Sequence, residues 1–395
     1  MIQRYFAGLS RATYLLAFSS LFGDISTEML YPVLPTYLIE TLKANGSIVG
    51  LVDGFAQASQ NIIQGFSGTL SDRLRKRKLI ALIGYLLAAL AKPLMGMASA
   101  WQGLFGARLL DRIGAGTRSA PRDALLAASV EEKDRGRAFG LESLGDNAGA
   151  FLGPLLALGM IYVMHVNLRA IFYFAIIPGL LAFCMVVFVS DVPAAAVVKS
   201  KIDLHAGRFP GRYWKYLAIT AVFNLGNSSN AFLILRTQDT GISLQSTILI
   251  YSMFNLAAAL ISYPAGSLSD RVGRRNILLL SFLIFVGAYL GFALTQNHLA
   301  IIALFIVYGM FQGIFRAVGK ALATDWIPPG LRASGIGWYS TTVGLSQLAA
   351  SIVAGMLWDR VDHTAVFFYG AGFALIGAAL LWVFMPSVDG YRPNG

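Results

Sequence analysis

Residues 68–78 read Gly-Thr-Leu-Ser-Asp-Arg-Leu-Arg-Lys-Arg-Lys, a charged stretch that separates two long apolar runs. Residues 266–275 read Gly-Ser-Leu-Ser-Asp-Arg-Val-Gly-Arg-Arg, again between apolar runs. The copies lie 198 positions apart, and at this offset the Gly, Leu, Ser, Asp and first Arg coincide. A motif repeated at half-chain spacing predicts that the chain consists of two structurally similar repeats. A basic loop that only flanks a membrane does not need the same Gly, Leu, Ser and Asp twice.

The composition predicts a membrane protein. Of the 395 residues, 56% are hydrophobic and only 13% are charged, whereas soluble proteins carry about 25% charged residues. The net charge of +11 arises in short loops between apolar runs, where the positive-inside rule accounts for it, so we expect no nucleic-acid partner. The single cysteine, Cys184, excludes an intrachain disulfide. The first apolar stretch has no small-residue cleavage site and is interpreted as a membrane span.

Twelve segments are long and apolar enough to cross a bilayer, which takes about 20 residues. In the first half they are Thr13–Ile39, Val49–Leu70, Leu79–Ala98, Trp101–Ala127, Gly136–Met164 and Ala170–Val189. In the second half they are Tyr216–Leu235, Thr247–Leu268, Ile277–Thr295, Leu299–Asp325, Ala333–Trp358 and Val366–Met385. Gly, Pro and charged residues interrupt several of them, which is typical of helices that line a cavity rather than face lipid.

The charge of the loops orients these spans. One side receives the basic clusters around residues 73–78, 133–137, 199–215 and 271–275, and the other mainly Lys43, Arg169 and Arg360. We expect the basic side and both termini to be cytoplasmic, in a multi-pass plasma (inner) membrane protein that acts as a monomer. A polar linker at 191–212 is expected to join two six-helix bundles, residues 1–190 and 213–395.

The repeated stretch resembles the signature loop of the major facilitator superfamily, which follows the second and eighth helices. The first copy has Arg75 where the second has Gly273, the residue usual in the family. The resemblance covers nearly the whole chain and implies an all-α integral membrane fold of twelve transmembrane helices in two pseudo-symmetric six-helix bundles. It also implies alternating access, with the two loops as a cytoplasmic gate. The gate residues would be Gly68, Asp72, Arg73, Gly266, Asp270 and Arg271.

Charged residues inside spans are costly and are therefore paired or functional. Asp24 and Glu28 lie four apart, on one face of the first span, and a continuous helix to Ile39 would place Glu28 near the midplane. We predict that these two carboxylates couple transport to protons, because low dielectric favours the protonated form of a carboxyl group. Polar stripes on the first, fourth, seventh and tenth spans, the cavity-lining helices of the family, predict the substrate site. Its residues would be Tyr31, Arg112, Asn227, Gln312, Arg316 and Lys320.

Other intramembrane charges are predicted to form structural ion pairs. Asp53 and Lys92 lie at similar depth in the second and third spans. Arg118 and Arg122 match the levels of Asp146 and Glu142 in the fifth span, so the same interpretation applies to them.

The fifth span carries Gly145, Gly149 and Gly153 at intervals of four, followed by Pro154. Small residues at this spacing let helices pack backbone to backbone. The same residues resemble the antiporter signature of exporters in the superfamily, although the second Gly that usually follows the Pro is absent. Arg108 and Gly114 to Gly116 resemble the signature of the fourth helix. Arg112 stands where that signature has Gly, which favours an anionic substrate.

We therefore predict a secondary active transporter, a proton-coupled exporter of a drug-like molecule or organic-anion metabolite. Import of a polar organic anion, such as a carboxylate or siderophore, stays open, and so does a non-transporting membrane sensor or scaffold. An enzyme is not expected, and neither a cofactor nor a metal is predicted. The sequence has no Gly-x-x-x-x-Gly-Lys-Ser/Thr loop for ATP, and its four histidines lie in loops or at span ends.

Overall fold

The computed structural model describes residues 9–74, 76–131, 134–190, 206–327 and 331–385. The N-terminal half contains α2 (Arg11–Glu28), α3 (Leu34–Thr36), the π-helical turn η1 (Tyr37–Thr41), α4 (Gly46–Leu74), α5 (Arg77–Met97), α6 (Trp101–Ala128), α7 (Arg135–Tyr162), α8 (Leu168–Phe174) and α9 (Ile176–Val187). The C-terminal half contains α10 (Gly211–Gly226), α11 (Ala231–Asp239), α12 (Leu244–Val272), α13 (Arg274–Leu294), α14 (His298–Asp325), α15 (Arg332–Arg360) and α16 (Ala365–Phe384).

These helices make twelve crossings if α2 to η1, α8 with α9, and α10 with α11 each count as one. Within the described ranges, nine helical segments are long and apolar enough to span a membrane by length and hydropathy alone. The other three are α2, α4 and α6, the first, second and fourth spans. Their mean hydropathy is lowered by polar residues that face the interior of the protein, which fits their place around a cavity.

The first and seventh spans are broken, so the continuous first helix to Ile39 used to place Glu28 is wrong. The first is interrupted between Glu28 and Leu34, which includes Pro32, and Pro35 follows inside α3. Each proline lacks the backbone N–H that a continuous helix would use. The seventh is interrupted between Gly226 and Ala231, where the sequence is Asn-Ser-Ser-Asn. Such side chains offer the backbone hydrogen bonds that compete with a helix. The breaks lie at matching positions of the 198-residue repeat.

The same offset relates α4 to α12, whose first and last residues correspond. Gly273 follows α12 with φ +97°, a backbone conformation that suits glycine and ends the helix sharply. Its counterpart, Arg75, lies outside the described residues. Most of the predicted linker, residues 191–205, also lies outside them, so the boundary between the bundles stays a prediction.

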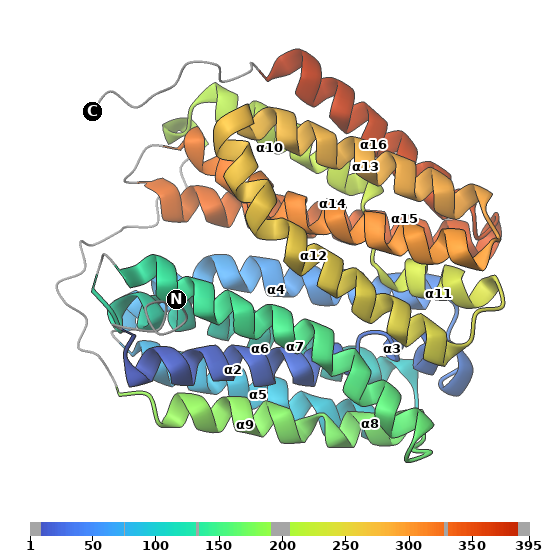
Figure 1. Cartoon of the computed structure of the whole chain (residues 1–395), viewed down its shortest axis with the longest axis horizontal. Coiled ribbons are helices and arrows are strands. Elements are labelled where there is room, and N and C mark those ends of the chain that lie inside the picture. The colour runs from blue at the N-terminus through green and yellow to red at the C-terminus, as the bar shows by residue number, and fades with distance from the viewer. Residues whose placement is uncertain (1–8, 75, 132–133, 191–205, 328–330, 386–395) are drawn as a thin grey trace.

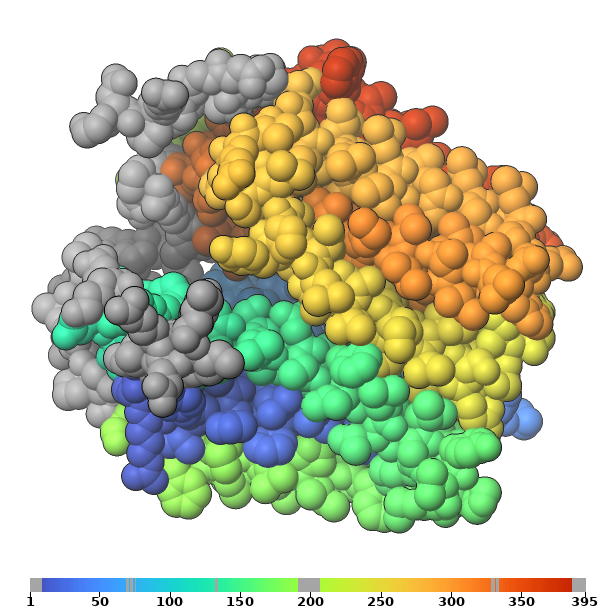
Figure 2. Space-filling view, in the orientation of Figure 1, coloured from blue at the N-terminus to red at the C-terminus, as the bar shows by residue number. Residues whose placement is uncertain are grey.

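The two halves face each other across the molecule, the N-terminal half in blue to green and the C-terminal half in yellow to red (Figure 1). α4 packs along α15 and α7 packs against α12. Small residues allow the contact: a Cβ on Gly50 would clash with the Ser351 carbonyl, and Gly65 lies against Gly337. In the left half of Figure 2, a recess lies between α12 (gold) and α7 (blue-green), and α4 (blue) is visible behind it.

Candidate functional site

A cavity of about 580 Å³ lies between the halves. Its wall is built from α2, α4, α6 and α7 on one side and from α12, α14, α15 and the α10–α11 break on the other. The wall includes every residue predicted to bind protons or substrate: Asp24, Glu28, Tyr31, Arg112, Asn227, Gln312, Arg316 and Lys320.

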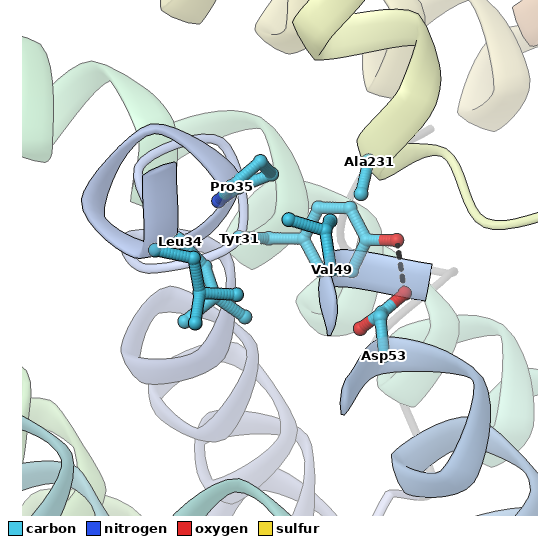
Figure 3. Close-up of a pocket in the computed structure, with 7 residues that line it drawn as sticks. Tyr31, Leu34, Pro35, Val49, Asp53 and Ala231 are labelled. Carbon is cyan, nitrogen blue, oxygen red and sulfur yellow. Dashed lines mark hydrogen bonds between the residues drawn. The ribbon is translucent and has the colours of Figure 1, made fainter. Parts of the chain in front are cut away.

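At one end of the cavity, both broken spans meet the carboxylate of Asp53 on α4. Tyr31, in the first break, donates its hydroxyl hydrogen to Asp53 Oδ2 at 3.0 Å (Figure 3). Ser229, in the second break, donates to the same oxygen at 2.6 Å. Arg108 of α6 approaches Asp53 Oδ1 at 3.0 Å and lies 5.6 Å from the centre of the Tyr31 ring. One buried acid therefore joins both halves at this end.

The predicted Asp53–Lys92 ion pair is wrong. Lys92 of α5 pairs instead with Asp111 of α6, which also lies 3.2 Å from Arg108. The depth of a residue in the membrane, estimated from the sequence, does not show which of several acids at similar depth Lys92 contacts. The close packing of α5 on α6, where Gly84 and Gly114 meet, brings Lys92 to the nearer helix. All four side chains are almost fully buried, so each charge depends on its partners.

Glu28 is the last residue of α2, so the depth predicted from a continuous helix does not apply to it. Its carboxylate accepts a hydrogen bond from Tyr251 of α12, at 3.2 Å, which again connects the halves. Among the described residues Glu28 has no ion-pair partner within 4 Å. Arg112 and Arg316 are the cations that act on it most strongly. Glu28 therefore interacts electrostatically with a cation from each half and forms a close ion pair with neither.

Asp24, one turn earlier on α2, lies 3.9 Å from Arg118. The guanidinium of Arg118 also lies 4.4 Å from the centre of the Tyr85 ring. Arg118 was predicted to pair with Asp146, which lies at the same depth in the fifth span, but it contacts Asp24 instead. Asp146 lies instead 3.6 Å from Arg122.

Arg122 forms ion pairs with both acids of the fifth span, Glu142 and Asp146. It lies 2.7 Å from Glu142 and 3.6 Å from Asp146. It also donates a hydrogen bond to Ser20 of α2 at 2.7 Å. These contacts tie α6, α7 and α2 together within the N-terminal half, as expected of a structural ion pair.

The glycines of α7 lie against α2. A Cβ on Gly145 would lie 2.5 Å from the Ala17 carbonyl oxygen, and one on Gly149 would lie 2.5 Å from that of Leu21. A Cβ on Gly153 would meet Ile25 O at 2.9 Å, and Pro154, the next residue, is buried inside the helix. Because α2 carries Asp24 and Glu28, this backbone contact sets the position of both carboxylates.

The predicted gate loops are described only in part. The side chains of Asp72 and Arg73 lie outside the described residues, and Gly68 packs beside Ala120 of α6. Asp270 lies 3.1 Å from Arg274, which also pairs with Asp325. The Asp270 contacts therefore stay inside the C-terminal half. A Cβ on Gly266 would meet no atom within 4 Å, and Arg271 is exposed.

Two kinds of site residue were missed from the sequence. Tyr251 and Ser229 are single polar residues in apolar or broken segments, and their importance depends on partners in the other half. The cavity face of α4 was detectable, because its polar residues recur at helical spacing. These are Gln57, Gln60, Asn61 and Gln64. In the described part of the chain, no group of three or more His, Cys, Asp or Glu is placed to hold a metal ion.

The family profile of the Major Facilitator Superfamily matches residues 16–225 and 217–395, nearly the whole chain. The chain belongs to the major facilitator superfamily. An uncharacterised MFS-type transporter of Methanocaldococcus jannaschii is 34% identical over 379 residues, covering 94% of each chain. The quinolone resistance protein NorA of Staphylococcus aureus is 30% identical over 217 residues, covering 55% of each chain.

Solved structures share the fold. A nucleoside transporter, NupG, aligns with a TM-score of 0.82 at 14% identity, covering 95% of this chain and all of the other. The predicted all-α fold of twelve membrane helices is therefore confirmed. As a major facilitator, the protein is a multi-pass membrane transporter of a small molecule and not an enzyme.

Proposed function

We propose that the protein is a proton-coupled exporter of a small organic molecule, working by alternating access, with Glu28 as its principal proton site. The observation that carries the proposal is the placement of Glu28. Its carboxylate lines the central cavity, binds Tyr251 of the other half at 3.2 Å and has no ion-pair partner among the described residues. A carboxylate without a fixed partner can change its protonation as the cavity opens to each side.

Protonation of Glu28 would change the force between the halves. The ionised carboxylate attracts Arg112 of α6 and Arg316 of α14, one from each half. A proton on Glu28 removes this attraction, so the relative energy of the two cavity openings depends on its charge. Asp24 lies beside Arg118 in the same cavity wall and is the second proton site of the proposal.

Two features support export. The quinolone resistance protein NorA is a relative over about half of the chain, and the residues around Gly149 and Pro154 resemble the antiporter signature. The same cavity would also serve import of a polar organic anion, so the direction is decided by experiment. We propose further that the basic loops and both termini are cytoplasmic, in the inner membrane, and that the monomer is the working unit.

The test is transport by the purified protein in proteoliposomes, with quinolones, other drugs and organic anions as candidate substrates. An imposed pH gradient should drive at least one compound against its own gradient, and internal pH should change in exchange. Glu28→Gln should abolish this accumulation but leave downhill exchange, and Asp24→Asn should weaken it.

Asp123→Asn is the matched control, because Asp123 also lines the cavity but its side chain is 44% exposed beside Arg122. Full accumulation in both the Glu28 and the Asp24 variant would contradict the proton sites. Import instead of export would appear as accumulation with the opposite orientation of the pH gradient. Absence of any flux would favour a sensor or scaffold.

A further inference from the structure

Arg112 is a buried cation that donates only part of the hydrogen bonds its guanidinium group can make. It is 6% exposed and donates one hydrogen bond, from Nη1 to Gln60 at 3.0 Å. Its nearest acid is Asp111, with Nε 3.4 Å from Oδ2. Its Nη2 is buried and has no hydrogen-bond partner among the described residues. A buried donor without an acceptor is costly, so Nη2 of Arg112 would gain from any acceptor that can reach it.

Asp111 does not neutralise Arg112 alone, because the same carboxylate also pairs with Lys92 and Arg108. Three cations therefore share this acid, and Arg108 additionally uses Asp53. The surplus of positive charge faces the cavity at Arg112, since this is the arginine of the cluster that lines the cavity wall.

Arg316 approaches the same region from the C-terminal half. It lines the cavity from α14, is exposed to it and makes no ion pair within the described part of the chain. Arg112 and Arg316 both act electrostatically on Glu28. Asp24, Arg108 and Tyr251 are further titratable groups that interact with Glu28.

We propose that Arg112 and Arg316 together bind an anionic group of the substrate, a carboxylate or a group of similar shape and charge. This inference rests on the transport function proposed above and adds the class of substrate. Guanidinium groups bind carboxylates through two parallel hydrogen bonds, and Nη2 of Arg112 is free to make one. The substrate anion would compete with the ionised carboxylate of Glu28 for the two arginines. Because Arg112 and Arg316 belong to different halves, a bound anion would contact both halves at once.

Part of the substrate is expected to be aromatic. Tyr31 and Tyr251 line the cavity beside Glu28, with ring centres 5.4 Å apart, and Phe315 lines it next to Arg316. Flat rings pack favourably against such side chains. The cavity of about 580 Å³ is large enough for a molecule of two or more rings.

Binding of three probes with one ring system tests the proposal: 2-naphthoate, 2-naphthamide and 2-naphthylmethylammonium, of charge −1, 0 and +1. Dissociation constants are measured by calorimetry on the purified protein in detergent, without any gradient, so that failure of the coupling mechanism does not affect the result. We expect 2-naphthoate to bind about tenfold more tightly than the amide and the amine. Arg112→Gln and Arg316→Gln should each remove this preference, and Arg112→Lys should weaken it.

Glu28→Gln should tighten the binding of 2-naphthoate, because the competing carboxylate is gone. Arg118→Gln is the matched control: it removes a cavity-lining arginine that already contacts Asp24, and should leave the preference intact. Size-exclusion profiles and thermal midpoints confirm that each variant is folded. Tighter binding of the amine, failure of 2-naphthoate to bind at millimolar concentration, or an unchanged preference in both arginine variants would overturn the proposal.

Discussion

Ser229, in the break between α10 and α11, donates a hydrogen bond to Oδ2 of Asp53 on α4 at a distance of 2.6 Å. The two residues belong to different halves of the protein. The same oxygen accepts the hydroxyl hydrogen of Tyr31, which lies in the break of the first span. Because Tyr31 and Ser229 occupy equivalent positions in the 198-residue repeat, one carboxylate joins the two breaks. Any motion that opens the cavity at this end must separate Asp53 from Ser229.

Ser229→Ala should favour opening of the cavity at this end. The variant removes one hydrogen bond to a charged group, which contributes about 1.5–3 kcal/mol. A shift of about 1 kcal/mol already changes the ratio of two states roughly fivefold. The measurement is the labelling rate of a cysteine at Gln57, in a Cys184→Ser background, with a membrane-impermeant thiol reagent added from the side of the Asp359 loop. We expect the rate to rise about fivefold or more.

Ser340→Ala is the matched control, because Ser340 lines the same cavity from the C-terminal half. It should label like the parent protein. Equal labelling of the Ser229 and Ser340 variants would show that the hydrogen bond to Asp53 does not hold this end closed.

Asp53→Ala should destabilise the protein far more than the loss of an exposed ion pair. The substitution leaves the buried Arg108 with only Asp111, which it already shares with Lys92. Removing one member of a buried ion pair costs about 3–5 kcal/mol. Asp270→Ala is the control: the side chain of Asp270 is 64% exposed, and exposed pairs contribute about 0–1 kcal/mol. Thermal unfolding in detergent compares the two, and similar midpoints would contradict the predicted role of the buried cluster.

The eight residues predicted to bind protons or substrate all line the cavity, but the partners of the buried charges were not all predictable from the sequence. Charges and amides stand out in apolar spans whatever their neighbours, so Glu28, Arg112 and Arg316 were recognisable from pattern alone. The partners of Asp53 depend on how α4 and α6 are rotated about their axes and on Ser229 from the other half. The spacing of polar residues along the sequence contains neither piece of information. The break before Leu34 did have a signal in Pro32 and Pro35, but the apolar residues around them favoured a continuous span.

Gly149→Ala should displace α2, although it adds only a methyl group. Its Cβ would lie 2.5 Å from the carbonyl oxygen of Leu21, a backbone atom that cannot rotate away. Overpacking of this kind costs about 1–3 kcal/mol. We expect a lower thermal midpoint and weaker proton-coupled transport, since Asp24 and Glu28 move with α2. Gly140→Ala on the same helix meets no atom within 4 Å and should be neutral or stabilising. Equal midpoints in the two variants would contradict the close contact between α7 and α2.

Asp359, at the end of α15, caps the N-terminus of a helix in the other half. Its carboxylate accepts hydrogen bonds from the backbone N–H groups of Gly46 at 2.8 Å and Ser47 at 2.7 Å, and from the Ser47 hydroxyl at 2.5 Å. The first N–H groups of a helix have no partner within it, and their partial positive charge favours an acid. A helix cap contributes about 1 kcal/mol. Here that free energy stabilises only the state in which α4 and α15 meet at this end.

Asp359→Ala should therefore increase the population in which the halves have separated at this end, by roughly fivefold for about 1 kcal/mol. Spin labels on cysteines at Glu40 and Val361, in the Cys184→Ser background, report the separation as a distance distribution, and the longer distances should gain weight. Asp362→Ala is the matched control, because Asp362 accepts from the backbone of Thr364 within its own half, at 2.7 Å. It should leave the distribution unchanged. If Asp359→Ala also leaves it unchanged, the cap does not contribute to closing the cavity at this end.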